Sequence, residues 1–555
     1  MHKVWFLGSI AALIVETGAC TDHPYDPGAP AIDPDAPSVH ITSPRRGTFA
    51  GNVKTLVVTG TASDDTRVAS VQVNGIEAAL DGAGGWQATI PLGVGTQLIH
   101  AVARDAQGNV GKESRAVVAG PMQLIATGVP RAISAAMSAQ TFDAISRGVT
   151  GFLRTGDLEA IIAPHNPVIA VGGGPDCLYA QASITRMSVG SATSVSLVPH
   201  SSGLALDVEL DRVAIGMHLR YAAACFDGSR DITVGASHIK VGGTLVVGVG
   251  RGAFDIELVD PDVAVTGFDV DLGSLPGEVV DLLHLDSAVS SVIGWATETF
   301  VVPLVNSSLS ALAAAATVSV LGTPVDIAVT PARIRVDDGG AVIELDSALR
   351  ARGDAASPGY VYVSNQVPAM STDGGFELAI ADDAANQLLG SFWAARGMEK
   401  AFDLTTGSYG NIGQLYDRVE LSAKLPPFVD ASRGSLKLTI GDLVATFRRG
   451  AAIATEVAVN AEVELRVTTG ADGKPRLDVG TPTTYVDVLD ENVDGANALS
   501  NAQFEAIASF ALSRVIAVGS GAVGAIPLPS FGGVAVRDVG IAEHSGYLVL
   551  QGNLQ

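Results

Sequence analysis

The sequence is poor in cysteine, in aromatic residues and in basic residues. Its 555 residues include 3 cysteines, and aromatic residues make up 5%. Lys and Arg number 34 against 58 Asp and Glu, which gives a formal net charge of −24 at pH 7. Binding to a nucleic-acid backbone depends on clustered Lys and Arg, and no such run is present. This balance excludes nucleic acid as a partner and disfavours attraction to anionic membrane surfaces.

The sequence also lacks the motifs of common enzyme classes. No Gly-x-Ser-x-Gly elbow, His-Glu-x-x-His helix, P-loop or dinucleotide fingerprint occurs in its proper context. The 10 histidines are scattered, and no nucleophile-and-base pair stands out. We therefore expect no enzymatic activity and no cofactor, with an unrecognised hydrolase as the alternative.

The first twenty residues are typical of a bacterial export signal. The apolar run Val4–Val15 is followed by the small residues Thr17–Ala19, directly before Cys20. This arrangement resembles a bacterial lipobox, whose cysteine is lipidated after cleavage. We expect residues 1–19 to be a lipoprotein signal peptide and Cys20 to carry a lipid that anchors the protein in the bacterial envelope. The expected location is the outer membrane, facing the periplasm or the surface; the alternative is an ordinary signal peptide and a soluble secreted protein.

Export places the two other cysteines in an oxidising compartment. Cys177 and Cys225 each lie at the end of a strand-like run. Their positions predict a disulfide between neighbouring strands, and two buried free thiols are the alternative.

Two segments precede the larger part of the chain. Residues 20–37 carry five prolines with interspersed Asp, a composition typical of an extended linker. Residues 38–119 then show short alternating strands separated by turns, and Asn74-Gly75 is a hairpin signal. This segment resembles the bacterial Ig-like domains of surface proteins, which implies a β-sandwich that acts as a spacer.

From residue 121 onward, amphipathic helices flank long alternating strands. Apolar residues at helical spacing predict a helix across Pro130–Leu153, and a second helical region runs from Pro276 to about Ala314. Between them, Leu204–Leu219 alternates apolar and polar residues, and the phase slips by one residue before Val213. A slip of this kind predicts a β-bulge that bends the sheet.

The same order repeats in part in the second half. The pattern predicts a strand at Phe376–Ile380, a helix at Ala381–Ala395, strands across 417–488, a helix at Ser500–Ile516 and a final strand near Tyr547–Gln551. Two halves that pair curved strands with long helices predict a β-dominated α+β fold.

Segments of this region resemble the lipid-binding family that includes bactericidal permeability-increasing protein, lipopolysaccharide-binding protein and cholesteryl ester transfer protein. The run Ile526–Gly532 (IPLPSFG) and the strand Gly546–Gly552 (GYLVLQG) are similar to the family's closing turn and last strand. The segment Gly359–Leu389 resembles the start of its second half.

The resemblance implies two elongated, helix-wrapped barrels, at 121–325 and 356–555, joined by a central sheet at 326–355. It also implies a single disulfide in the first half, where Cys177 and Cys225 lie. In that family an apolar pocket between helix and sheet takes up acyl chains, so the implied partners are phospholipid, fatty acid or another hydrophobic ligand. Endotoxin-binding members use a basic tip, which this acidic chain lacks.

Apolar residues at helix and strand spacing are candidates to line such a pocket, although plain core is the alternative for each. In the first half the candidates are Met137, Phe142 and Ile145 from the predicted helix and Leu206, Val208, Met217 and Leu219 from the facing strands. In the second half they are Leu388, Phe392 and Phe504.

One metal site is also a candidate. Asp490, Asn492 and Asp494 precede Gly495 with the alternation of a calcium loop, where oxygen side chains face one ion. Position twelve of such a loop is Asn501 here instead of Glu, and an acidic loop before a helix with Ser500 as its N-cap is the alternative.

The sequence therefore predicts an envelope lipoprotein that binds, and passes on, hydrophobic ligands. The alternative is a surface adhesion or structural protein in which the same modules are fully packed.

Overall fold

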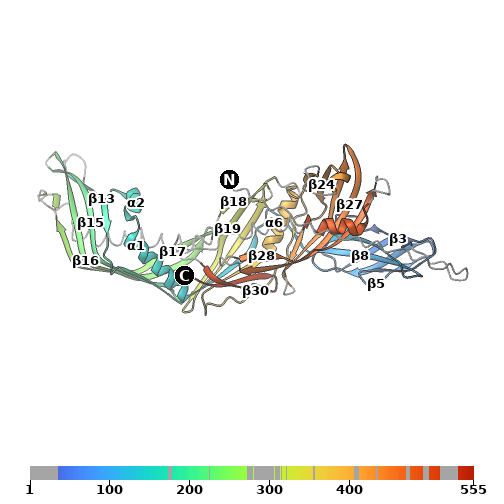
Figure 1. Cartoon of the computed structure of the whole chain (residues 1–555). Coiled ribbons are helices and arrows are strands. Elements are labelled where there is room, and N and C mark those ends of the chain that lie inside the picture. The colour runs from blue at the N-terminus through green and yellow to red at the C-terminus, as the bar shows by residue number, and fades with distance from the viewer. Residues whose placement is uncertain are drawn as a thin grey trace, which may run out of the picture.

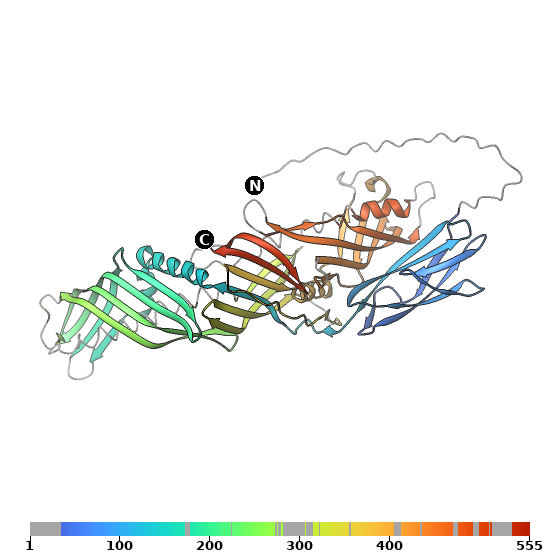
Figure 2. The same ribbon diagram turned by 90° about the horizontal axis from the view of Figure 1, so that it is seen from below.

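The computed structural model describes most of the chain as an elongated, strand-rich molecule with few helices (Figures 1 and 2). The described residues are 35–172, 178–223, 225–271, 275, 279–280, 306, 313, 315–320, 322–353, 357–404, 412–432, 436–469, 475–491, 499–509, 511–512 and 536–554. The strands nearest the N-terminus lie at one end of the molecule, and the long strands β13, β15 and β16 lie at the other. Most of the predicted helical region Pro276–Ala314 lies outside the described residues.

The N-terminal domain is a β-sandwich, as predicted from its resemblance to Ig-like domains. One sheet has the order β1-β3-β7-β6 (Ser38–Ser43, Thr55–Ser63, Gly85–Pro91, Ala79–Leu80). The other has the order β2-β9-β8-β4-β5 (Thr48–Gly51, Val110–Ala119, Gly95–Asp105, Val68–Val73, Ile76–Glu77). Asn74 and Gly75 both have positive φ, 49° and 79°, as the hairpin between β4 and β5 requires.

The sheet at the far end is made of unusually long strands. Its order is β12-β13-β15-β16-β17 (Ile169–Gly172, Tyr179–Ser188, Gly203–Ala223, Phe226–Gly250, Ala253–Asp271), and β14 (Ser194–His200) pairs with β15. On β15 the buried side chains lie at even-numbered positions from Leu204 to Val208 and then at the odd-numbered positions Val213, Met217 and Leu219. Arg212, at the change, has a φ of 44°. The predicted phase slip is therefore present as a local kink at Arg212. The predicted β-bulge is wrong for the β15–β16 pair, which keeps one register across the kink, with Asp211 opposite His238 and Val213 opposite Ala236.

A seven-stranded central sheet draws on four separate stretches of chain. Its order is β18-β19-β20-β11-β22-β31-β30 (Ala315–Val320, Thr323–Asp337, Gly340–Ala351, Val129–Ser138, Phe376–Ala381, Tyr547–Leu554, Val536–His544). β22 and β31 form where the sequence pattern predicted strands. Because β11 and β31 come from opposite ends of the region, the central sheet ties its two halves together.

The helix predicted at Pro130–Leu153 is wrong in its first part. Residues 129–138 form β11, and helix α1 begins only at Ala139 and ends at Thr155. Consequently Met137 lies on a strand and not on a helix. β11 pairs on both sides and buries small residues on both faces, so its sequence shows no polar alternation that would mark it as a strand.

A third curled sheet forms most of the C-terminal region. Its order is β23-β24-β26-β27-β28 (Lys400–Asp403, Arg418–Ala423, Leu436–Arg449, Ala452–Thr469, Pro475–Val479), with β25 (Phe428–Asp430) on β26 and β29 (Thr483–Glu491) on β27. Residues 501–509 are helical. Ser500 caps this helix, which was the alternative to the calcium loop: its Oγ accepts from the Gln503 backbone N–H, and its own N–H donates to the Gln503 side chain. The short elements β10 (Met122–Gln123), β21 (Tyr360–Val361), α2 (Leu158–Ile162), a 3-10 turn (Ala163–His165) and α7 (Ile412–Leu415) complete the described fold.

Helix α6 (Asp382–Ala394) forms where a helix was predicted, but the face that it buries is polar. Its buried side chains include Asp382, Asp383, Asn386, Gln387 and Ser391. Gln387 donates to the carbonyls of Ile125 and Thr127 and accepts from the Leu349 N–H. The other four bind backbone groups at Ala431, Val363, Val429 and Ala351. The helix therefore satisfies backbone groups of the central sheet, of β25 and of the segments that connect them.

Burial of the two aspartates in α6 makes the stability of the folded protein depend on pH. Burial raises the pKa of Asp382 to about 6 and that of Asp383 to about 7. A carboxyl whose pKa is raised in the folded state favours folding while it is neutral. Its contribution is complete below about pH 4 and is lost as the pH rises through about 7.

We expect Asp383→Asn to gain stability relative to the wild type as the pH rises from 5 to 8. The amide stays neutral and still accepts from the Val363 N–H, whereas the wild-type carboxyl ionises at a cost of up to about 4 kcal/mol. Thermal unfolding of both proteins across this range measures the difference. A difference independent of pH would contradict the account, and Asp373→Asn, at an exposed site, is the control.

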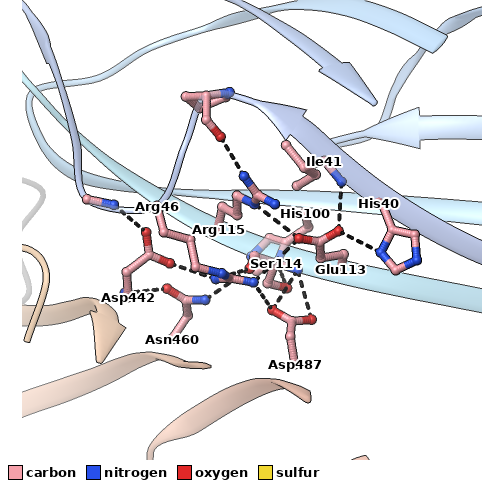
Figure 3. Close-up of polar contacts among 12 residues, drawn as sticks. His40, Ile41, Arg46, His100, Glu113, Ser114, Arg115, Asp442, Asn460 and Asp487 are labelled. Atoms are coloured by element: carbon pink, nitrogen blue, oxygen red, sulfur yellow. Dashed lines mark hydrogen bonds and ion pairs between the residues drawn. The ribbon is translucent and has the colours of Figure 1, made fainter. Parts of the chain in front are cut away.

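The Ig-like domain is fixed to the C-terminal sheet by a buried ion network (Figure 3). The Arg46 guanidinium donates to Asp442 at 2.8 Å and to Asp487 at 3.1 Å, and it lies 3.4 Å from Glu113. Asp442 is fully buried and also accepts from the Gly47 N–H, and Asp487 accepts from the Ser114 N–H. Around it Leu98, Val118, Leu425 and Phe428 pack in one apolar cluster. The domain is therefore docked and does not behave as a free spacer.

Arg46→Met should lower the free energy of unfolding by about 3 kcal/mol, because it leaves the buried Asp442 carboxylate without its cation. It should also expose the Ser114 and Gly47 amides, which hydrogen exchange measures directly. The neighbouring Arg45→Met removes the same charge from an exposed site and should change neither quantity. Equal protection of these amides in the two variants would show that the network does not hold the domain.

Candidate hydrophobic ligand site

One face of the far sheet is apolar along β15, β16 and β17. Leu206, Val208, Val241, Leu245 and Phe254 are buried on this face within one cluster. The alternate residues form the opposite face, where Lys240 lies 2.9 Å from Asp207 and 3.7 Å from Glu209. This alternation gives the sheet one apolar face and one charged face.

Helix α1 covers only part of the apolar face. Phe142, Ile145 and Val149 bury their side chains against the sheet, and the main contacts of α1 are with β14, β11, β20 and β31. Two hydrogen bonds hold the helix on β14: the Ser146 Oγ accepts from the Leu197 N–H, and the Thr150 Oγ1 accepts from the Val195 N–H. Figure 2 shows α1 lying alongside the strands of the far sheet. The helix is thus anchored away from the β16–β17 hairpin.

Six apolar side chains on β16 and β17 remain partly exposed on the face that α1 leaves. They are Val247, Val249, Ile256, Leu258, Val263 and Val265, and we call them the apolar stripe. Cross-strand register joins them to each other and to the buried cluster: Val247 lies opposite Ile256, and Leu245 lies opposite Leu258. The stripe carries no polar side chain, so it can contact only the hydrocarbon part of a ligand.

The first-half residues named from the sequence divide between two clusters. Met137, Phe142, Ile145, Leu206 and Val208 share the cluster that the stripe borders. Met217 and Leu219 lie beyond the Arg212 kink in a second cluster with Ile162, Ile184 and Ile232. All seven are buried; the five in the first cluster lie beneath the stripe, and Met217 and Leu219 are core residues outside it. The stripe itself was missed as a site, although its alternation had predicted the strands.

The three second-half candidates do not come together. Leu388 is half-buried on α6, and Phe392 is buried on the same helix near Gly397. Phe504 lies in a separate cluster, 5.6 Å between ring centroids from Phe447, which is 4.8 Å from Tyr416. These rings fill the interior of the C-terminal sheet.

Several predicted residues lie outside the part of the chain that the structure describes. They are Cys20, Cys177, Asn492 and Asp494. Asp490 lies in β29, opposite Glu456, and Cys225 lies at the turn between β15 and β16 with a φ of 66°. The calcium loop and the Cys177–Cys225 disulfide therefore stay predictions. Within the described ranges, no group of three or more His, Cys, Asp or Glu side chains is placed to hold a metal ion. The helices described are all too short or too polar to cross a membrane.

Residues 37–120 match the family model of glucodextranase domain B. No curated protein matches the chain. Among solved structures, the chain is similar to a lipopolysaccharide binding protein, with 13% identity over 77% of this chain and 99% of that one and a TM-score of 0.34. It is also similar to P47 of Clostridium botulinum E1 (9% identity, 77% and 100% coverage, TM-score 0.25) and to P47 from Clostridium botulinum A2 (10%, 77% and 98%, TM-score 0.23).

Proposed function

We propose that this protein binds lipids or other hydrophobic molecules, such as phospholipid or fatty acid, on the apolar face of its far sheet, and passes them on. The apolar stripe is the observation that carries the proposal. Partly exposed, contiguous apolar side chains on a soluble surface are characteristic of sites that bind apolar ligands.

The apolar area of the stripe is large enough to bind an alkyl chain with a favourable free energy. Each methylene moved from water onto an apolar surface contributes about 0.8 kcal/mol when it is fully buried. An alkyl segment of about ten carbons along the stripe, half-buried, therefore gains about 4 kcal/mol before the cost of association is subtracted. The alkyl segment needs no polar contact with the protein, and the side chains of the stripe contain no polar group.

The wider architecture and location belong to the same proposal. Two helix-wrapped modules at 121–325 and 356–555, joined through the central sheet, are supported by the four chain segments which that sheet combines. A lipid on Cys20 would hold the protein at the bacterial envelope, and mass spectrometry of the acylated protein tests for it. We further propose that the chain has no enzymatic activity.

The alternative function is adhesion or structural support by fully packed modules. The aromatic cluster around Phe447 favours it for the C-terminal sheet, whose interior is filled. We therefore assign ligand binding to the far sheet, and support of that sheet to the C-terminal region and the docked Ig-like domain.

Val247→Thr/Val249→Thr/Ile256→Thr should weaken binding of a fluorescent lipid by tenfold or more. Each change places a hydroxyl on the stripe, and burying an unpaired hydroxyl costs about 1 kcal/mol or more. The two Val→Thr changes nearly keep the side-chain shape, and Ile256→Thr also shortens the side chain by one heavy atom. Fluorescence titration measures the affinity. Val246→Thr, on the same strand but facing the opposite side with 42% exposure, is the matched control and should bind as the wild type does. Equal weakening by both changes would show that the stripe is not the site, and no uptake by the wild type would refute the function.

A further inference from the structure

The kink in the far sheet crosses all three of its longest strands. On β15 it lies at Arg212, and the register places Ser237 of β16 beside this residue. The Ser237 Oγ donates to the Thr266 carbonyl of β17, and the next residue, Gly267, has a φ of 62°. A Cβ on Gly267 would lie within 2.1 Å of the Ser237 Oγ, so this position requires glycine. The three strands therefore change the phase of their side chains along one line.

Because the phase changes together, the apolar face continues beyond this line. Phe268 of β17 lies opposite Ala236, which is buried in the cluster that the stripe borders. Residues directly opposite each other on neighbouring strands project to the same face, so Phe268 extends the row of the stripe. Its side chain is 40% exposed. Val270 comes next, opposite Val234, and Val234 in turn lies opposite Ile215, which packs against both apolar clusters.

The row ends at a closed cluster near the tip of the sheet. Ile162 of α2, Leu219 of β15 and Val279 are fully buried there. We call the stripe and its continuation together the apolar track, with the members Val247, Val249, Ile256, Leu258, Val263, Val265, Phe268 and Val270.

The track is longer than one acyl chain. The stripe spans about 30 Å from Ile256 to Val265, at about 3.3 Å per residue, and Val270 extends the track to about 45 Å. The hydrocarbon core of a bilayer is about 30 Å thick and contains two leaflets, so one acyl chain accounts for about 15 Å. An ordinary acyl chain can therefore bind wholly on the stripe, without reaching Phe268.

We propose that the site takes linear hydrocarbon chains about twice as long as an ordinary acyl chain, and that Phe268 is a specificity-determining residue for this length. This inference rests on the proposed function. The affinity of an alkyl chain rises with the apolar area that it removes from water, so it rises only while the chain still finds uncovered apolar side chains. The part of the track beyond the kink contributes to the binding of a long chain and not of a short one.

The test compares two fluorescent alcohols with the same label, one with an unbranched chain of sixteen carbons and the other with thirty-two. Both probes are delivered from cyclodextrin, which keeps them monomeric, and each is titrated with the full chain. We expect the longer probe to bind at least about tenfold more tightly, because it covers more of the track.

A substitution beyond the kink localises the effect. Phe268→Asn should weaken binding of the thirty-two-carbon probe by about fivefold and change binding of the sixteen-carbon probe by less than about twofold. Unchanged binding of the short probe also shows that the variant is folded. Phe402→Asn is the matched control, since Phe402 lies on β23 of the C-terminal sheet with 38% exposure, and it should alter neither affinity.

The outcomes separate this inference from the proposed function. Equal affinities of the wild type for the two probes would overturn the inference, and so would an equal response of both probes to Phe268→Asn. In either case binding of the sixteen-carbon probe keeps the proposed function. Failure of both probes to bind the wild type would overturn the proposed function itself.

Discussion

The structure depends on one constraint: sheets of long strands with a single apolar face need something to cover that face. β15, β16 and β17 contain 21, 25 and 19 residues, far more than one short helix can shield. Helix α1 covers the side nearest the central sheet, and the apolar stripe is what it leaves partly exposed. Burial of apolar area drives folding. Apolar surface that stays partly exposed in the folded chain can therefore bind an apolar ligand.

The other regions of the molecule cover their apolar faces with their own side chains. In the C-terminal sheet, aromatic rings from β26, from the residue after α7 and from the 501–509 helix pack against one another in the interior. Between the regions, α6 uses amide and carboxyl side chains to satisfy backbone groups that no strand pairs. The Arg46 network performs the corresponding task at the Ig-like domain, where three carboxylates meet one guanidinium (Figure 3). The central sheet contacts the far sheet through β19.

Much of this arrangement could be predicted from residue patterns, and the parts that could not have identifiable causes. Period-two alternation located the long strands, and the phase slip before Val213 located the kink at Arg212. β11 was mistaken for helix because a strand buried on both faces shows no alternation. The polar face of α6 was unpredictable for the opposite reason, since Asn386 and Gln387 look like solvent-exposed residues unless their backbone partners are known. Contacts between segments far apart in sequence, such as Arg46 with Asp442, leave no local signal.

The central claim is that an alkyl chain lies along the apolar stripe of β16 and β17. Photo-crosslinking of the full chain with a lipid that carries a diazirine in its alkyl tail, followed by peptide mass spectrometry, tests this most directly. The account predicts labelling concentrated in residues 245–265. Labelling that is absent there, or is confined to the C-terminal sheet, would contradict it.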